Sequence, residues 1–216
     1  MGDAATHVSA CMADGALLKK SSNVARELPN NAVILVGFMG AGKSSVGREL
    51  GQRLNWFFED LDDRIEALER RTVAAIFRDS GEAEFRRVEH AALQQALEEL
   101  RGGSSRIIAL GGGAFVQKEN ATLLQASSAP TVFLDAPVEE LWRRCCTQAN
   151  ANGAERPLLR NEEEFRKLYE GRRAGYGSAT LHVQTGGRTV EAIAREIAEK
   201  LGLKTIAVRT EQGEVE

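Results

Sequence analysis

The sequence has no long hydrophobic run, and this absence excludes membrane-spanning proteins. No stretch approaches the roughly 18 consecutive apolar residues that a transmembrane helix requires. The opening segment, MGDAATHVSACMADGALLKK, also lacks the basic start and apolar core of a secretory signal. We therefore expect a cytoplasmic protein that has no membrane partner.

Positive charge is not in excess either. The chain has 28 Lys and Arg residues against 31 Asp and Glu residues, which gives a formal net charge of -3. Proteins that bind nucleic acids concentrate Lys and Arg against the phosphates. We therefore exclude nucleic acid as a partner.

Cysteine is also scarce, with Cys11, Cys145 and Cys146 as its three positions. An odd number of cysteines does not give a complete disulfide framework, and their spacing does not match a metal site. Reduced structural thiols are the favoured interpretation, as is usual for a cytosolic protein.

The chain does contain enough apolar material for one α/β domain. It has 216 residues, of which 43% are hydrophobic, and two full domains would be cramped at this length. Residues 1–30 show no periodicity and are predicted to form a disordered extension, residues 31–205 the domain, and residues 206–216 a flexible tail. Apolar segments predict strands at 32–38, 56–61, 106–110, 131–136 and 182–185, and helical patterns cover 43–54, 61–77, 82–100 and 189–203.

This alternation of strands and helices predicts a parallel sheet with helices on both faces, which is a three-layer α/β/α fold. In such folds, ligands bind at the carboxyl ends of the strands. The segments that follow each strand are therefore the candidate functional site.

A glycine-rich loop follows the first strand. Gly37, Gly42, Lys43 and Ser44 fit the pattern G-x-x-x-x-G-K-[ST] between a strand and a helix, which is typical of a phosphate-binding loop. Residues without a Cβ let backbone N–H groups converge on an anion, whereas the alternative is a tight turn with an exposed lysine. We predict that the loop binds a nucleoside triphosphate with magnesium, through Gly40, Ala41, Gly42, Lys43, Ser44 and Ser45, with the Ser44 hydroxyl on Mg²⁺.

The loop alone does not say which molecule receives the phosphate. No N-K-x-D tetrapeptide, which would read guanine, follows the fourth strand. This counts against a GTPase and favours a small-molecule kinase, whose acceptor pocket should lie beside the loop.

Carboxylates follow the second strand in EDLDD, residues 59–63. If the strand continued, its two-residue period would place Asp60 and Asp62 on one face, toward the γ-phosphate. Asp60 could then hold magnesium through water, and Asp62 could accept the proton of an attacking hydroxyl. The alternative is a helix N-terminus, where the dipole favours carboxylates; we assign Asp63 and Glu66 to that role alone.

Two further motifs are candidates for the acceptor pocket. In GEAEFRRVE, Arg86 falls at the border between core and cleft, and Glu82 and Glu89 are spaced to hold its guanidinium for a substrate carboxylate. Taken alone, Arg86 would be an ordinary solvated charge. Gly111, Gly112 and Gly113 follow the third strand, where close contact of the backbone with a ligand is predicted and a simple turn is the alternative.

The crossover at about residues 145–165 is polar and is predicted to be a mobile lid. Its closure would bring an arginine onto the transferring phosphoryl group and exclude water. The candidates in and before the lid are Arg143, Arg144, Arg156 and Arg160, and Arg172 and Arg173 lie near the end of the next helix.

Taken in order, these motifs resemble the shikimate kinase family. They are GFMGAGKS from Gly37, Asp60-x-Asp62, GExxFRxxE from Gly81, GGG from Gly111 and RPLL from Arg156. The resemblance spans roughly residues 32–203. It implies a five-stranded parallel sheet in the order 2-3-1-4-5 with a lid, and transfer of the γ-phosphate of ATP to the 3-hydroxyl of shikimate in aromatic amino-acid biosynthesis.

The resemblance also implies roles for individual residues. Lys43 and Ser44 keep the roles given above, Asp60 would bind magnesium through water, and Asp62 would be the base. Arg86 would bind the shikimate carboxylate and the backbone of Gly111 to Gly113 would line the ring. Arg156 would lie between the two substrates and Arg144 along the adenine.

A second carboxylate-binding arginine belongs to an R-x-P-L-Y segment in the family. Counting back four residues from Tyr176 selects Arg172, but Arg173 stays open because the proline is absent. The longer lid and Ala121, where the family usually has arginine, are further departures.

Two other functions stay open beside a monomeric shikimate kinase. One is a related kinase for another hydroxy acid such as gluconate, which would share the loop and the fold but not the combination of the Asp60-x-Asp62 pair with the Gly111 triplet. The other is a non-catalytic nucleotide-binding module, which would have no need for Asp62, Arg86 and Arg156.

Overall fold

The computed structural model describes residues 31–152 and 161–206. The predictions for residues 1–30, for most of the tail and for Arg156 lie outside the described residues.

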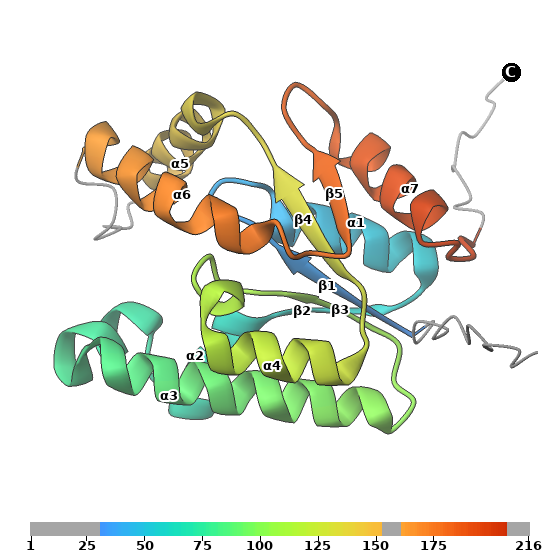
Figure 1. Ribbon diagram of the computed structural model, residues 1–216, viewed down its shortest axis with the longest axis horizontal. Helices are drawn as coiled ribbons and strands as arrows, with labels where there is room; N and C mark the ends of the chain where they lie inside the picture. The colour runs from blue at the N-terminus through green and yellow to red at the C-terminus, as the bar shows by residue number, and fades with distance from the viewer. Residues whose placement is uncertain (1–30, 153–160, 207–216) are drawn as a thin grey trace, which may run out of the picture.

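Five parallel strands form one sheet in the order β2-β3-β1-β4-β5 (Figure 1). The predicted three-layer fold and the strand order implied by the resemblance are thus confirmed. Every residue of the central strand is buried, as expected for a strand covered on both faces. The strands lie close to their predicted positions: β1 (Ala32–Val36), β2 (Phe57–Asp60), β3 (Arg106–Ala109), β4 (Thr131–Asp135) and β5 (Leu181–Gln184).

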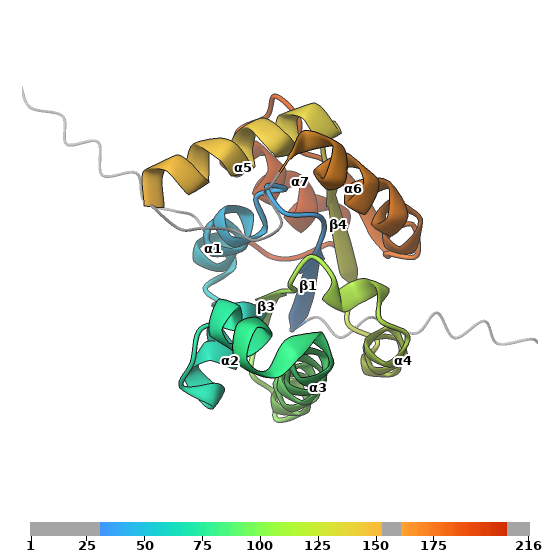
Figure 2. The ribbon, with the colours of Figure 1, turned by 90° about the vertical axis from the view of Figure 1, so that its left-hand side faces the viewer.

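Helices cover both faces of this sheet. α1 (Lys43–Leu54) and α7 (Val190–Lys200) lie on one face, and α3 (Val73–Arg101) and α4 (Lys118–Ser127) on the other (Figures 1 and 2). None of the described helices is long and apolar enough to cross a membrane. The remaining elements are α2 (Leu61–Glu69), the 3-10 helix η1 (Ala114–Val116), α5 (Val138–Asn152) and α6 (Glu162–Tyr176).

The helix predicted over residues 61–77 is wrong, because the chain breaks there into two helices. α2 ends at Arg70, which has a left-handed φ of 54°. Thr72 then caps α3, since its hydroxyl oxygen accepts a hydrogen bond from the N–H of Ala75 at 3.1 Å. α3 therefore begins before the predicted start at residue 82, and it passes through Gly81, where φ is 79° and the helix kinks.

The predicted lid at 145–165 is helical on both sides. α5 extends to Asn152, and α6 begins after Asn161, whose side-chain oxygen accepts a hydrogen bond from the N–H of Glu164 at 2.7 Å. Residues 153–160 lie outside the described part of the chain.

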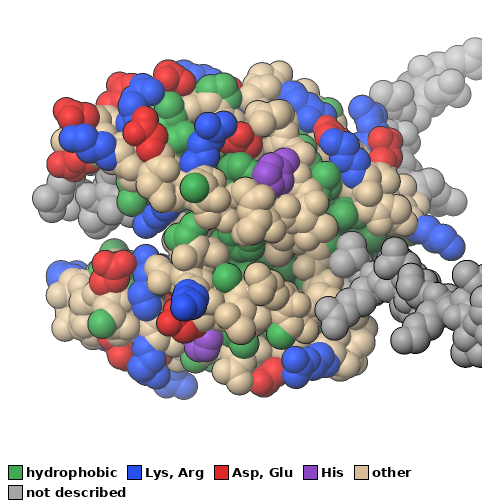
Figure 3. All heavy atoms as spheres, in the orientation of Figure 1, with side chains coloured by type: hydrophobic (Ala, Val, Ile, Leu, Met, Phe, Trp, Pro, Cys, Tyr) green, Lys and Arg blue, Asp and Glu red, His purple; other side chains and the backbone are tan. Residues whose placement is uncertain are grey.

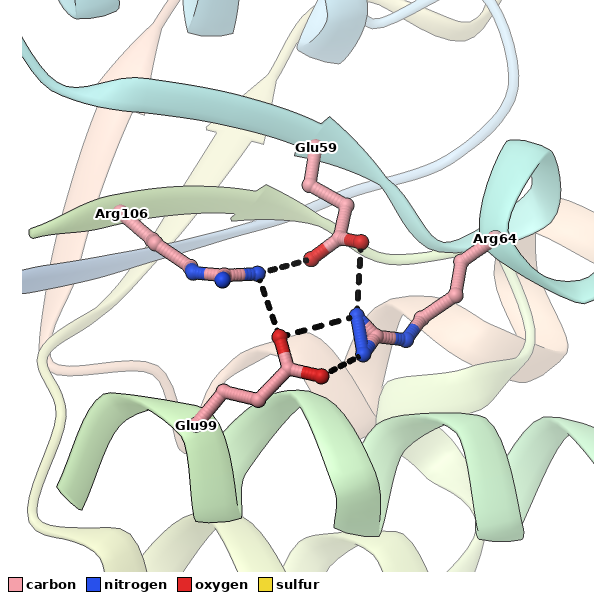
Figure 4. A network of polar contacts seen from close by, with 4 residues as sticks. All are labelled: Glu59, Arg64, Glu99 and Arg106. Atoms are coloured by element: carbon pink, nitrogen blue, oxygen red, sulfur yellow. Dashed lines mark hydrogen bonds and ion pairs between the residues drawn. The ribbon is translucent and has the colours of Figure 1, made fainter. Parts of the chain in front are cut away.

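Four charged side chains form a closed ionic ring that the sequence did not predict (Figure 4). Arg64 of α2 contacts Glu59 of β2 at 2.7 Å and also contacts Glu99 of α3. Arg106 of β3 contacts the same two carboxylates, at 3.2 Å from Glu59 and 2.7 Å from Glu99. The ionic ring therefore joins two strands to the two helices that follow β2.

Replacing Arg64 with methionine should destabilise the fold. The Arg64 side chain is 10% exposed, and the change would leave Glu59 and Glu99 with a partner missing, so we expect the free energy of unfolding to fall by about 3 kcal/mol. Urea unfolding followed by circular dichroism would measure it. The matched control is Arg78→Met, which breaks the exposed pair of Arg78 with Asp79; an equal effect of the two changes would show that the ionic ring contributes nothing special.

Candidate active site

The loop between β1 and α1 is forced into a tight path by its neighbours. A Cβ on Gly37 would lie 2.7 Å from the carbonyl oxygen of Leu134, and one on Gly40 would lie 2.7 Å from that of Leu141. Both glycines have a positive φ, 147° and 80°, that other residues rarely adopt. Gly42 then caps α1 without a side chain, so the helix N-terminus faces the cleft with room for an anion.

Lys43 and Ser44 project from the first turn of α1. The Lys43 ammonium donates to the carbonyl oxygens of Gly37 at 3.0 Å and Phe38 at 3.2 Å. The Ser44 hydroxyl donates to the carboxylate of Asp60 at 2.8 Å. The loop and the end of β2 are thus joined by a hydroxyl and a carboxylate, both hard oxygen donors.

Asp60 and Asp62 are brought together by a helix cap. The strand ends at Asp60 and does not continue to Asp62, so the strand-period argument is wrong. Asp60 is the N-cap of α2, and its carboxylate accepts the N–H of Asp62 at 3.1 Å. Both carboxylates still line the same cleft. The helix N-terminus, given above as the alternative to a functional pair, is therefore the geometry that builds the pair.

The Asp62 carboxyl group has a raised pKa. Burial and the negative charge of Asp60 raise its pKa to about 6, while Lys43 acts in the opposite direction. At a pH just above 6, the Asp62 carboxyl group is mostly ionised but is still close to its pKa. This balance suits a group that accepts a proton near neutral pH.

Arg86 is held by the two glutamates predicted for it. Its guanidinium donates to Glu89 at 2.8 Å and to Glu82 at 3.1 and 3.3 Å. Glu89 is 1% exposed, and burial raises its pKa. Arg86 therefore presents a guanidinium of fixed orientation to the cleft.

The glycine triplet lies directly against the charged side chains of the cleft. A Cβ on Gly111 would lie 2.9 Å from the Asp62 carboxylate, and one on Gly113 would lie 3.0 Å from two guanidinium nitrogens of Arg86. A side chain at either position would displace these groups. The triplet therefore leaves room for the side chains of Asp62 and Arg86. This is a second reason for glycine at these positions, beside the predicted contact of the backbone with a ligand.

These groups share one cleft of about 650 Å³. Figure 3 shows the surface hollowed between the part formed by α5 and α6 and the part formed by α2 and α3. Of the predicted site residues that the structure describes, Ala41 and Arg144 are not among those that line it. A phosphate-binding loop, an acidic pair and an oriented arginine thus face a common space.

Comparison with known proteins agrees with this arrangement. The family model described as shikimate kinase matches residues 39–202. The shikimate kinase of Thermus thermophilus is 42% identical over 80% of this chain and 91% of its own length. The chain belongs to the shikimate kinase family.

Other family members give the same result. The shikimate kinase of Persephonella marina is 34% identical over 78% of this chain and 98% of its own length. The solved structure of shikimate kinase from Acinetobacter baumannii in complex with shikimate has a TM-score of 0.68 at 32% identity, covering 79% of this chain and 92% of that one.

The arginines that the shikimate kinase pattern singled out lie in different surroundings. Arg172 lines the cleft, with its guanidinium 5.8 Å from the centre of the Phe38 ring. Arg173 is 63% exposed and lies 3.9 Å from Asp135. These placements favour Arg172, the choice made by counting back from Tyr176.

Arg144 lies behind the phosphate-binding loop. It donates to the carbonyl oxygens of Gly40 at 3.3 Å and Thr185 at 3.0 Å, and to the Glu140 carboxylate at 2.5 Å. In the described part of the chain it therefore supports the loop backbone from α5. Its contact with an adenine stays a prediction.

Several cleft residues were missed by the sequence reasoning. Asp63 and Glu66, which were assigned only to the helix N-terminus, also line the cleft, and Glu66 accepts the N–H of Val73 at 2.8 Å. Val73 and Phe77 are four residues apart, the spacing of one helix face, but the predicted helix over residues 61–77 assigned them to the end of α2 and not to the start of α3. The others missed are Met39, Ala74, Phe85, Leu110 and Gln148.

The acidic pair gives a testable prediction for the free protein. Asp60→Asn removes the neighbouring charge that raises the pKa of Asp62, so we expect that pKa to fall from about 6 by roughly half a unit. Carboxyl ¹³C NMR titration would measure it. Glu66→Gln, a change in another carboxylate of the cleft, should leave the titration of Asp62 unchanged, and equal shifts in the two variants would contradict the assigned cause.

Proposed function

We propose that this chain transfers the γ-phosphoryl group of ATP to the 3-hydroxyl of shikimate, giving shikimate 3-phosphate and ADP for aromatic amino-acid biosynthesis. The observation that carries the proposal is the shared cleft. Lys43 of the phosphate-binding loop, Asp62 and Arg86 all line it. Both substrates can therefore be held side by side in one space.

The acceptor end of the cleft matches a small hydroxy acid. Arg86 and Arg172 would bind the shikimate carboxylate, and burial lowers the pKa of Arg172, so a substrate anion would stabilise its partly desolvated positive charge. The backbone of Gly111 to Gly113 would lie along the ring. Membership of the shikimate kinase family favours this acceptor over gluconate.

The chemical step needs a proton acceptor and charge compensation. Asp62 would take the proton of the 3-hydroxyl as that oxygen bonds to the γ-phosphorus and the bond to the leaving ADP oxygen breaks. Lys43 would neutralise the outer phosphates. Arg156, which lies outside the described residues, would add charge from the lid.

Magnesium is part of the proposal. The Ser44 hydroxyl and the Asp60 carboxylate, 2.8 Å apart, are oxygen donors of the kind that Mg²⁺ prefers beside phosphates. When bound, the ion would offset the negative charge of the triphosphate. We also propose a monomer that acts in the cytoplasm.

An acceptor panel tests the proposal. ADP release should be measured with shikimate, quinate, gluconate, nucleoside monophosphates and the methyl ester of shikimate. We expect shikimate to give the highest kcat/KM, and the ester a value about 100-fold lower because it lacks the charge for a bidentate pairing. A higher kcat/KM with gluconate or a nucleoside monophosphate would overturn the assignment.

Asp62→Asn tests the chemical step. The change keeps the size of the side chain but removes the base, so kcat should fall about 10²- to 10⁴-fold while KM for ATP stays nearly constant. Because the pKa of Asp62 is about 6, wild-type kcat/KM for the acceptor should decline below pH 6, where the carboxyl is protonated. That decline should be absent from the residual activity of the variant.

The matched control is Asp63→Asn, one residue further along α2. It removes a carboxylate from the same helix turn and should change kcat little. A normal kcat in Asp62→Asn would exclude Asp62 as the base.

A further inference from the structure

Tyr176, the last residue of α6, is completely buried and yet has a polar contact. Its ring stacks on Phe133 at 4.9 Å and on Phe115 at 6.3 Å between centroids. Its hydroxyl donates a hydrogen bond to the carbonyl oxygen of Gly112. Burial raises the pKa of Tyr176 to about 12, so the hydroxyl keeps its proton at neutral pH.

Gly112 is the middle residue of a loop that has no side chains to fix it. The backbone anchors the loop at its two ends, where Leu110 donates to Leu35 at 2.9 Å and Ala114 donates to Gly111 at 3.1 Å. Between these anchors the hydroxyl of Tyr176 holds the carbonyl of Gly112. A single side-chain atom thus fixes the centre of the triplet.

The position of this loop determines the space available to three charged groups. The Cβ positions of the triplet lie 2.9 Å from Asp62, 3.7 Å from Arg172 and 3.0 Å from Arg86. A shift of Gly112 would therefore move backbone toward or away from both arginines of the acceptor end. The Cβ position of Gly112 also lies 3.6 Å from the Met39 nitrogen and 3.8 Å from the Gly37 carbonyl oxygen, so the triplet touches the phosphate-binding loop through backbone atoms.

Tyr176 and Arg172 also lie on the same face of α6, because they are four residues apart. One helix face therefore supplies both a cleft cation and the group that fixes the adjacent loop. A shift of α6 would move Arg172 and the Tyr176 hydroxyl together.

We propose that Tyr176 is a positioning residue for the acceptor: its hydroxyl fixes Gly112 and thereby the geometry of the Arg86 and Arg172 pocket. This inference rests on the proposed function, since it assumes an acceptor carboxylate in that pocket. The hydroxyl does not contact the reacting atoms. Its effect should therefore be larger on acceptor binding, which uses the two guanidinium groups, than on nucleotide binding.

Tyr176→Phe tests the proposal, because it keeps the stacked ring and removes one hydroxyl. We expect KM for shikimate to rise about tenfold, since a buried carbonyl loses its donor, with a clearly smaller change in KM for ATP and kcat within about threefold. The amide proton of Gly113, in the peptide group of the Gly112 carbonyl, should shift in ¹H–¹⁵N spectra. This second measurement needs no turnover.

The matched control is Tyr169→Phe, two turns earlier on α6. Tyr169 is also buried, and its hydroxyl donates to Asp135 at 3.1 Å, away from the glycine triplet. This variant should leave KM for shikimate and the Gly113 signal unchanged, although urea unfolding should show a similar loss of stability. If the Tyr176 hydroxyl contributed only to stability, Tyr176→Phe and Tyr169→Phe would have the same KM for shikimate.

The outcomes separate this inference from the proposed function. If the wild-type chain does not phosphorylate shikimate, the proposed function fails. If it does, and Tyr176→Phe has a normal KM for shikimate or raises both KM values equally, only the positioning role is overturned.

Discussion

Lack of space at the carboxyl edge of the sheet is the constraint on which the rest of the site depends. The loop after β1 runs so close to β4 that a Cβ on Gly37 would lie 2.7 Å from a Leu134 carbonyl oxygen. The loop after β3 runs close to Asp62, since a Cβ on Gly111 would lie 2.9 Å from the Asp62 carboxylate. A side chain on Gly37 would meet the backbone of β4, and one on Gly111 would displace the Asp62 carboxylate. Because the two loops are narrow, the volume between them stays open as one cleft that the phosphate-binding loop and the acidic pair can share.

Burial in this cleft acts on the charges in a consistent direction. It raises the pKa of Asp62 and Glu89 and lowers that of Arg172, so in each case it favours the neutral form. The ionic ring in Figure 4 is different, since each of its four groups contacts two groups of opposite charge. Its four charges pair with one another without a ligand, so the ionic ring stabilises the fold. In the cleft, by contrast, the Arg172 guanidinium would gain a further opposite charge from a bound anion, and perturbed titration of this kind is typical of functional sites.

Elements that carry a local sequence pattern, such as an apolar run or a fixed spacing of glycine and lysine, could be predicted from the sequence. The buried run AVILV and the spacing from Gly37 to Ser44 gave β1, the loop and α1 nearly to the residue. The break at Arg70 could not be predicted in the same way, because the residues on either side continue a helical pattern and the break depends on a left-handed Arg70 and a Thr72 cap. The ionic ring joins residues as far apart as Arg64 and Glu99, and no local pattern specifies such a pairing.

The end of α6 departs from the family pattern and still places Arg172 and Tyr176 beside the cleft loops. RRAGY has Ala174 where the family segment has proline, and the helix continues unbroken to Tyr176. Gly175 lets it approach η1 closely, since a Cβ there would lie 2.5 Å from a methyl group of Val116. This close approach brings the Tyr176 hydroxyl to the Gly112 carbonyl. Helical spacing then places Arg172 one turn back, over the Phe38 ring and beside the cleft. The helix itself therefore sets the distance between the cation and the loop, and the proline is not needed for it.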